Sequence, residues 1–158
     1  MGNLYEQSGD LLTYDKIHIL VHQTNCFGIM GAGIAKKIAA KYPEAERANR
    51  EYSFINSPEA IFSSVLPIRC HDGKYVVNMY AQFKYGRGRR QTNYDAFEKC
   101  LGLLAVFCSE HPTLTVGFPY GIGCGLAGGD WNIVSRMIRS FAKKVPNDVF
   151  IIKLQEEQ

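Results

Sequence analysis

Apolar and polar positions along the chain follow two periods, one typical of buried strands and the other of amphipathic helices. Short apolar runs predict strands at 17–21, 61–66, 75–80, 114–118 and 149–154. Segments with apolar residues three and four positions apart predict four helices. They span 31–42, 43 to about 53, about 93 to about 108, and 131 up to Pro146. Strands thus alternate with helices along the chain.

Several of these helices carry sequence signals for their ends. Pro43 suits the first turn of the second helix, because the amide hydrogen that proline lacks has no partner there. Either Thr92 or Asn93 would cap the long third helix, and Asp130 would cap the last one. Pro146 stops that last helix.

This alternation predicts an α/β fold with a mainly parallel central sheet and helices on both faces. In such folds, ligands bind beyond the carboxyl ends of the strands. The chain has 158 residues and shows no repeat, low-complexity stretch or linker, so we expect a single domain spanning 1–158.

Composition and charge narrow the class of protein. Hydrophobic residues make up 46% of the chain and charged residues 21%, which is ordinary for a globular protein, and a net charge of +3 is too small to indicate general nucleic-acid binding. The five cysteines are odd in number and form no C-x-x-C pair, which argues against a disulfide framework or a zinc site. The N-terminus has no signal-peptide pattern, and no apolar run is long enough for a membrane span. We therefore expect a cytoplasmic monomer with reduced thiols and no bound metal.

Two glycine clusters, at 28–33 and 121–129, hold eight of the 15 glycines. Each follows a predicted strand and precedes a predicted helix. Glycine permits positive φ angles and close approach of a ligand to the backbone, and a helix N-terminus offers unpaired amide donors. Two such loops that face each other would hold a pyrophosphate. The alternative is that both clusters are tight turns and helix stops.

Neither cluster is a standard nucleotide motif. A Walker loop requires Lys-Ser/Thr after its second glycine, whereas Gly33 is followed by Ile34 and Ala35. The dinucleotide fingerprint G-x-G-x-x-G is absent after the first predicted strand. An ATPase and a dehydrogenase are therefore disfavoured.

Three sequence blocks carry a resemblance to a known family. They are SGDLL near the start, LVHQTNCFGIMGAGIA after the first predicted strand and FPYGIGCGLAGGDW before the last predicted helix. In this order, over nearly the whole chain, they resemble the macro domain family. The most similar branch contains the ADP-ribose 1''-phosphate (Appr-1''-p) processing phosphatases and the terminal ADP-ribose glycohydrolases. The resemblance implies a three-layer α/β/α sandwich with a mixed central sheet that binds ADP-ribose. We expect no cofactor.

The resemblance also implies roles for particular residues. Asp10 would accept a hydrogen bond from the adenine amino group, with the backbone of Leu11 beside it, and Asn25 would contact the distal ribose. For both polar residues the alternative is a turn. Backbone amides would bind the diphosphate from two sides: Gly31, Ala32, Gly33 and Ile34 on one, and Ile122, Gly123, Cys124, Gly125 and Leu126 on the other.

Two residues are candidates for catalysis. His22, in the first long block, would act as a general acid or position a water molecule, and the alternative is a structural histidine. Asp130 is the second candidate, and its alternative is the helix cap. We interpret Cys124 as a small residue rather than a nucleophile, because no base lies near it in the sequence.

The chain departs from the terminal glycohydrolases at two positions. Where that branch has a catalytic lysine, this sequence has Gln82, with Lys84 reached only by a small shift of the alignment; where it has an aspartate, this sequence has Ala127. Glutamine cannot form the covalent link to the opened ribose.

A cationic segment follows, with Lys84, Arg87, Arg89 and Arg90 in KYGRGRR, and it is either a flap over an anionic ligand or a solvated loop.

From the resemblance and the departure at Gln82, we expect hydrolysis of ADP-ribose 1''-phosphate. The alternatives are removal of ADP-ribose from ADP-ribosylated proteins or nucleic acids, and an ADP-ribose reader without turnover.

Overall fold

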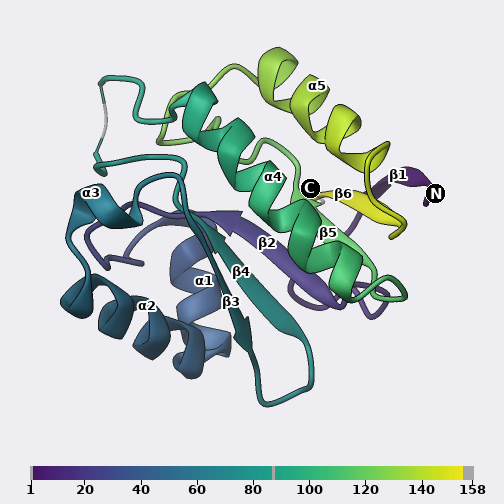
Figure 1. Ribbon diagram of the computed structural model, residues 1–158, viewed down its shortest axis with the longest axis horizontal. Helices are drawn as coiled ribbons and strands as arrows, with labels where there is room; N and C mark the ends of the chain where they lie inside the picture. The colour runs from purple at the N-terminus through teal and green to yellow at the C-terminus, as the bar shows by residue number, and fades with distance from the viewer. Residues whose placement is uncertain (1, 87, 155–158) are drawn as a thin grey trace, which may run out of the picture.

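The computed structural model describes residues 2–86 and 88–154, and within them the strands form one six-stranded sheet (Figure 1). The strands are β1 (Leu4–Ser8), β2 (Ile19–Gln23), β3 (Val65–Arg69), β4 (Tyr75–Met79), β5 (Val116–Pro119) and β6 (Val149–Lys153), in the spatial order β1-β6-β5-β2-β4-β3. Strand β3 runs antiparallel to β4, and the other neighbouring pairs run parallel. The predicted mixed, mainly parallel sheet is confirmed.

Helices cover both faces of this sheet (Figure 1). They are α1 (Gly33–Lys41), α2 (Pro43–Ile55), α3 (Pro58–Ile61), α4 (Tyr94–Glu110) and α5 (Trp131–Ala142). On one face, Ile19 and Val21 of β2 pack in one core with residues of α4 and α5, among them the fully buried Phe97 and Ile138. On the other face, Leu20 packs against Ile38 and Tyr42 at the α1–α2 junction. The fold is thus the expected three-layer α/β/α sandwich.

The sequence signals located the starts of three helices, whereas α5 ends at Ala142, four residues before the predicted stop at Pro146. Helix α2 begins at Pro43. Asn93 rather than Thr92 caps α4, because its side chain accepts a hydrogen bond from the Ala96 amide at 2.9 Å. Asp130 caps α5 by accepting from the Asn132 amide at 2.9 Å.

The predicted strand at 61–66 is wrong in its first half. Residues 58–61 form α3, because Pro58 occupies the first turn and the Ser57 side chain caps it by accepting from the Ala60 amide at 3.2 Å. Strand β3 starts only at Val65. It contains Pro67, which a sheet tolerates because β3 lies at an edge.

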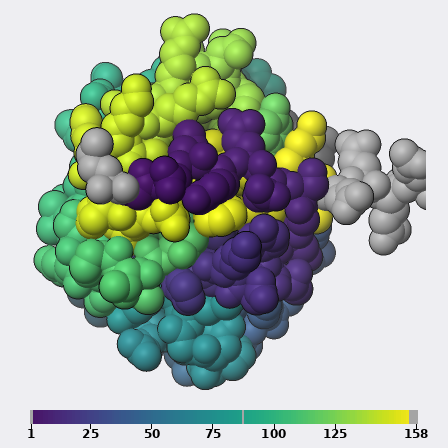
Figure 2. Space-filling view, turned by 90° about the vertical axis from the view of Figure 1, so that its right-hand side faces the viewer, coloured from purple at the N-terminus to yellow at the C-terminus, as the bar shows by residue number. Residues whose placement is uncertain are grey.

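Strand β1 was not expected from the sequence. Four of its five residues are exposed, so it has no apolar run to mark it. It forms the other edge of the sheet, where Tyr5 pairs with Phe150 of β6. Figure 2 shows this N-terminal segment lying beside the C-terminal strand. In the described part of the chain, no helix combines the length and the apolar character that crossing a membrane requires.

Candidate functional site

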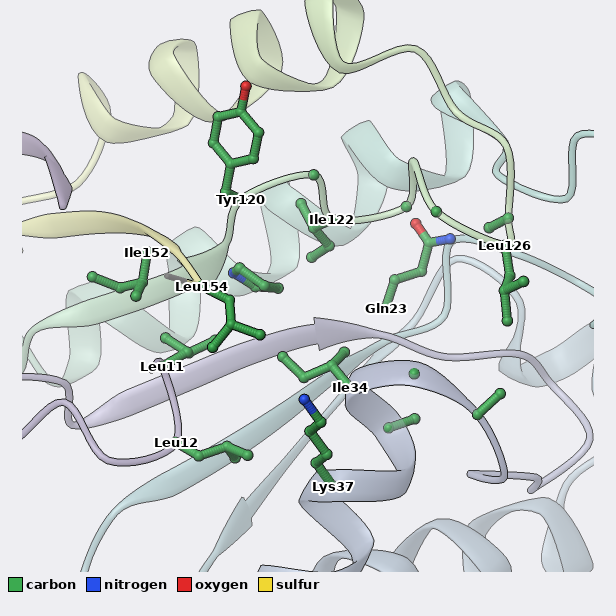
Figure 3. A pocket seen from close by; sticks show the side chains of 18 of the residues that line it. Leu11, Leu12, Gln23, Ile34, Lys37, Tyr120, Ile122, Leu126, Ile152 and Leu154 are labelled. Carbon is green, nitrogen blue, oxygen red and sulfur yellow. The ribbon is translucent and has the colours of Figure 1, made fainter. Parts of the chain in front are cut away.

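A cleft opens at the carboxyl ends of β2 and β5, between the start of α1 and the loop that joins β5 to α5 (Figure 3). It has two compartments. The first has a volume of about 400 Å³, and Asp10 and Leu126 are among the residues that line it. The second has a volume of about 440 Å³, and Asn25 and Tyr85 are among the residues that line it. The compartments share Gln23 and Gln82 in their walls, so they form one continuous cleft.

The first compartment is mainly apolar. Figure 3 shows Ile34 and Lys37 extending into it from α1, opposite Ile122 and Leu126 of the β5–α5 loop. Its far end is closed by apolar side chains from the β1–β2 loop and the end of β6, namely Leu11, Leu12, Ile152 and Leu154. Such a lining suits a flat, weakly polar ring system.

Unpaired backbone amides lie at the start of α1. No side chain caps this helix at Ala32. Among the residues that the structure describes, no acceptor is found for the amides of Gly31, Ala32, Gly33 and Ile34. These four residues, the predicted diphosphate donors on this side, line the cleft. A helix N-terminus with free amides favours a negatively charged group.

The β5–α5 loop faces α1 from the other side of the cleft. Some of its backbone amides are hydrogen-bonded and others are not. Those of Ile122 and Cys124 donate within turns, to Pro119 O at 3.0 Å and Gly121 O at 2.8 Å, whereas those of Gly123, Gly125 and Leu126 have no acceptor in residues 2–86 and 88–154. Of the five amide donors predicted on this side, the structure thus leaves three free.

Gly123 has two reasons to be glycine. Its φ angle is +73°, in the left-handed region. A Cβ atom built on it would come within 2.8 Å of Gln23 Oε1. The close approach of this loop to the end of β2 therefore depends on the absence of a side chain here.

An amide network forms the floor where the compartments meet. Gln23 Nε2 donates to Gln82 Oε1 at 2.8 Å and to Thr92 Oγ1 at 2.9 Å. The buried Thr92 hydroxyl donates in turn to Gly123 O at 2.6 Å. This chain of bonds ties the end of β2 to the β5–α5 loop. Within the described residues, the buried Gln23 Oε1 has no partner.

Asp10 and Asn25 both line the cleft and both stabilise turns. Asp10 lies in the first compartment, where its Oδ1 accepts from the Leu12 amide at 3.0 Å. Asn25 lies in the second, where its Nδ2 donates to Ile29 O at 2.8 Å and its Oδ1 accepts from the Phe27 amide at 2.9 Å. Each of the two side chains therefore stabilises a turn and lines the cleft at the same time.

The structure does not bring His22 into the cleft. Its side chain is fully buried beneath α2, on the face of the sheet that α1 and α2 cover, and Nε2 contacts Asn78 Oδ1 at 2.6 Å. Asn78 Nδ2 donates to the Tyr80 hydroxyl, which donates to Asn49 Oδ1 of α2 at 2.7 Å. Burial lowers the pKa of His22 to about 4, against the raising effect of the Asn78 bond, so the ring is neutral at physiological pH. This geometry favours the structural alternative over the acid.

Asp130 and Cys124 also lie outside the lining of both compartments. The Asp130 carboxylate is exposed and caps α5. Burial, and to a lesser degree the Asp130 charge, raises the pKa of the Cys124 thiol to about 11, and its Sγ contacts Ile122 O at 3.3 Å. A thiol with that pKa is a poor nucleophile, in agreement with its interpretation as a small residue.

Sequence reasoning missed three residues that shape the cleft, Lys37, Gln23 and Tyr120, as site residues. Lys37 follows Ile34 by three positions and so shares its helix face, which was a usable signal. Gln23 lies in the same block as His22, but only the strand pleat decides which of the two faces the cleft. Tyr120 is one of several aromatic residues near the glycine clusters in the sequence, and nothing in the sequence indicates which of them lines the cleft.

Comparisons with known proteins bear on the fold. No protein-family model matches the sequence. An uncharacterised 17.5 kDa protein from the tk-vs intergenic region of Enterobacteria phage T4 is 25% identical over 129 residues, which are 80% of this chain and 81% of that protein. The macrodomain of Mycobacterium tuberculosis DarG has a TM-score of 0.84 and 24% identity, over 99% of this chain and 100% of its own.

A second solved structure resembles the whole chain. Thermosipho africanus DarTG in complex with ADP-ribose has a TM-score of 0.81 and 18% identity, and the match covers 100% of this chain and 43% of that one. This chain has the macrodomain fold. Its cleft lies where α/β folds bind ligands, beyond the carboxyl ends of the parallel strands.

Within this macrodomain fold, Gln82 occupies the cleft floor and Ala127 its wall, and both border the two compartments. Gln82 Nε2 donates to Lys84 O at 2.8 Å, which fixes the orientation of the amide. The Lys84 side chain is exposed and does not line either compartment. The small alignment shift that would make Lys84 the catalytic lysine therefore gains no support from its position.

Proposed function

We propose that this chain binds ADP-ribose in the two-compartment cleft. The observation that carries the proposal is the pair of facing amide rows, one at the start of α1 and the other in the β5–α5 loop. Such rows match a diphosphate, which presents acceptor oxygens on both sides. The ADP-ribose in the Thermosipho complex, a protein of the same fold, supports the choice of ligand.

The two compartments suggest the orientation of the ligand. The adenine ring lies in the first compartment, among Ile34, Leu154 and other apolar side chains, with Asp10 at its edge. Asp10 Oδ2 accepts no bond from the described residues, which leaves it for the adenine amino group. The distal ribose lies in the second compartment beside Asn25, and the diphosphate lies between them.

Calorimetric titration with ADP-ribose tests this proposal. The Asp10→Ala variant should bind ADP-ribose more weakly by about 1–3 kcal/mol, because the adenine amino group loses its acceptor. Asp15→Ala is the matched control, since Asp15 is exposed in the same loop and lies outside the cleft lining. Equal affinity in wild type and Asp10→Ala would remove the adenine assignment, and no heat at millimolar ligand would remove the whole proposal.

We further propose ADP-ribose 1''-phosphate as the substrate. Water would attack phosphorus, the bond from phosphorus to the 1''-oxygen would break, and the products would be ADP-ribose and inorganic phosphate. Gln82 favours this reaction over the glycohydrolase, because its amide can orient water but cannot form a covalent link to ribose. In the described lining of the second compartment, Tyr85 is the one titratable side chain, so catalysis would depend on positioned water and amide donors.

Turnover assays separate the possible activities. Phosphate release from ADP-ribose 1''-phosphate supports the phosphatase, and release of ADP-ribose from ADP-ribosylated protein or DNA supports the glycohydrolase. Tight binding with neither product identifies a reader. Release of phosphate that disappears in folded His22→Ala or Asp130→Ala would return that residue to the reaction in spite of its position.

A further inference from the structure

A third hollow adjoins the cleft on its outer side. It has a volume of about 470 Å³ and lies between Arg89 and Arg90 on one side and the β5–α5 loop on the other. Leu126 borders this hollow and both compartments, so the hollow lies next to the cleft. Neither the diphosphate nor the adenosine end of the ligand accounts for it.

The two arginines are held against the glycine loop. The amides of Gln91 and Thr92, the residues that follow Arg90, donate to Ala127 O at 2.8 and 3.1 Å. Gly128 has a φ angle of +73°, and a Cβ atom on it would lie 3.4 Å from Arg90 Cα. The end of the cationic segment is therefore anchored to the loop rather than free, whereas Arg87 lies outside the described residues.

Two positively charged residues, Arg89 and Arg90, line this hollow. In residues 2–86 and 88–154, neither Arg89 nor Arg90 forms an ion pair with a carboxylate. The Arg90 guanidinium lies over the Tyr94 ring, 4.5 Å from its centroid, which orients the cation. The backbone amide of Asp130 donates to the Tyr94 hydroxyl. The Asp130 carboxylate instead accepts a hydrogen bond from the Asn132 amide.

We infer that this hollow is a phosphate subsite for a group attached beyond the distal ribose. The inference rests on the proposed function, because the hollow gains its meaning from ADP-ribose in the adjoining cleft. Guanidinium groups bind phosphate oxygens through paired N–H donors, and at Gly125, which also lines the hollow, the space where a Cβ would lie is open. The phosphate is either the 1''-monoester or a phosphodiester of a nucleic-acid strand that carries ADP-ribose.

Binding measurements on three proteins test the subsite. They are wild type, the double variant Arg89→Gln/Arg90→Gln and the charge-matched control Arg47→Gln/Arg136→Gln, whose arginines are exposed on α2 and α5. We expect the Arg89/Arg90 variant to lose about tenfold or more in affinity for ADP-ribose 1''-phosphate and to keep its affinity for ADP-ribose. The control should bind both ligands as wild type does, and thermal melting should show all three proteins folded.

A second arm distinguishes the two sources of phosphate. The ligand is a short oligonucleotide that carries one ADP-ribose, compared with a peptide without phosphate that carries the same group. Selective loss of oligonucleotide binding in the Arg89/Arg90 variant identifies the diester, selective loss of 1''-phosphate binding identifies the monoester, and loss of both identifies a subsite that accepts either.

The subsite is overturned if the variant binds each phosphorylated ligand as tightly as wild type does. It is also overturned if the variant loses ADP-ribose affinity to the same extent, since the arginines would then act on the cleft in general. If wild type binds no ADP-ribose at all, the proposed function itself fails, which is a different result from either of these.

Discussion

His22 and Gln23 are neighbours at the end of β2, yet they belong to two regions with different tasks. His22 enters a closed polar network with Asn78 and Tyr80 beneath α2. Gln23 enters the floor network of the cleft with Gln82 and Thr92. The first network is sealed from solvent, and the second borders the space where a ligand fits.

The difference follows from the strand pleat. Successive side chains of a strand point to opposite faces of the sheet. Leu20 and His22 face the α1–α2 layer, whereas Val21 and Gln23 face the side of α4 and the β5–α5 loop. Adjacent polar residues in one motif can therefore serve stability in one case and binding in the other, and the following variants test this division.

The largest effect is expected from His22→Ala. The variant leaves a cavity and an unpaired Asn78 Oδ1 inside the protein, so the free energy of unfolding should fall by about 3 kcal/mol. Affinity for ADP-ribose should not change. Urea unfolding and calorimetry measure the two quantities, with His71→Ala as the control for loss of an exposed histidine, whose ion pair with Glu44 lies at the surface. If His22→Ala were as stable as wild type but bound ADP-ribose much more weakly, His22 would serve binding rather than stability, and the division between His22 and Gln23 would be wrong.

Acid should destabilise the protein through the same histidine. The pKa of His22 is about 4 in the folded protein and 6.5 as its ordinary value, because burial disfavours the charged ring. The unfolded chain therefore binds the proton first, so stability is complete above pH 6.5 and is lost as the pH falls towards 4, by about 3 kcal/mol.

Unfolding curves of wild type and His22→Gln over this pH range isolate the contribution of His22, since all other titrating groups are common to both proteins. Wild type should lose more stability than the variant between pH 7 and pH 4. Parallel losses in the two proteins would mean that His22 titrates normally.

Gln23→Ala should have the reverse profile. It removes the floor of the cleft and releases Gln82 and Thr92, so the Kd for ADP-ribose should rise about tenfold, while the loss of two hydrogen bonds should lower the free energy of unfolding by about 1–2 kcal/mol, less than in His22→Ala. Gln7→Ala is the control, because Gln7 is exposed on β1 at the edge of the sheet. Unchanged affinity in Gln23→Ala would show that the floor network does not serve binding.

The smallest effect is expected from Thr92→Val. The variant keeps the shape of the side chain and loses the hydroxyl that joins Gln23 to Gly123 O, which should cost about 1 kcal/mol of stability. We expect a modest rise in the Kd for ADP-ribose, because the β5–α5 loop is held less firmly. If Thr92→Val weakened ADP-ribose binding more than Gln23→Ala does, Thr92 rather than Gln23 would be the more important residue of the floor network for binding.

Much of the fold could be predicted because its signals are local. The apolar runs of β2, β4, β5 and β6 and the capping residues Asn93 and Asp130 act over a few neighbouring residues. Strand β1 could not be found in this way, because its stability comes from hydrogen bonds to β6, far away along the chain. The error at 61–66 arose where an apolar run spans a short capped helix and the start of an edge strand.

The cleft could be predicted in part for the same reason. The glycine loops and Asp10 were found, because glycine content and turn residues are visible in the sequence. The places of His22 and Gln23 were not, since periodicity says that they face opposite ways but not which way the cleft lies.

The sequence by itself determined the alternation of strands and helices and the two glycine loops beyond β2 and β5. Only the tertiary structure decided which amides of those loops stay unpaired, which face of β2 meets the ligand space, and that two arginines lie beside Gly128. The physical reason is range: backbone propensity and capping depend on near neighbours, whereas burial and unpaired charge depend on residues that only folding brings together.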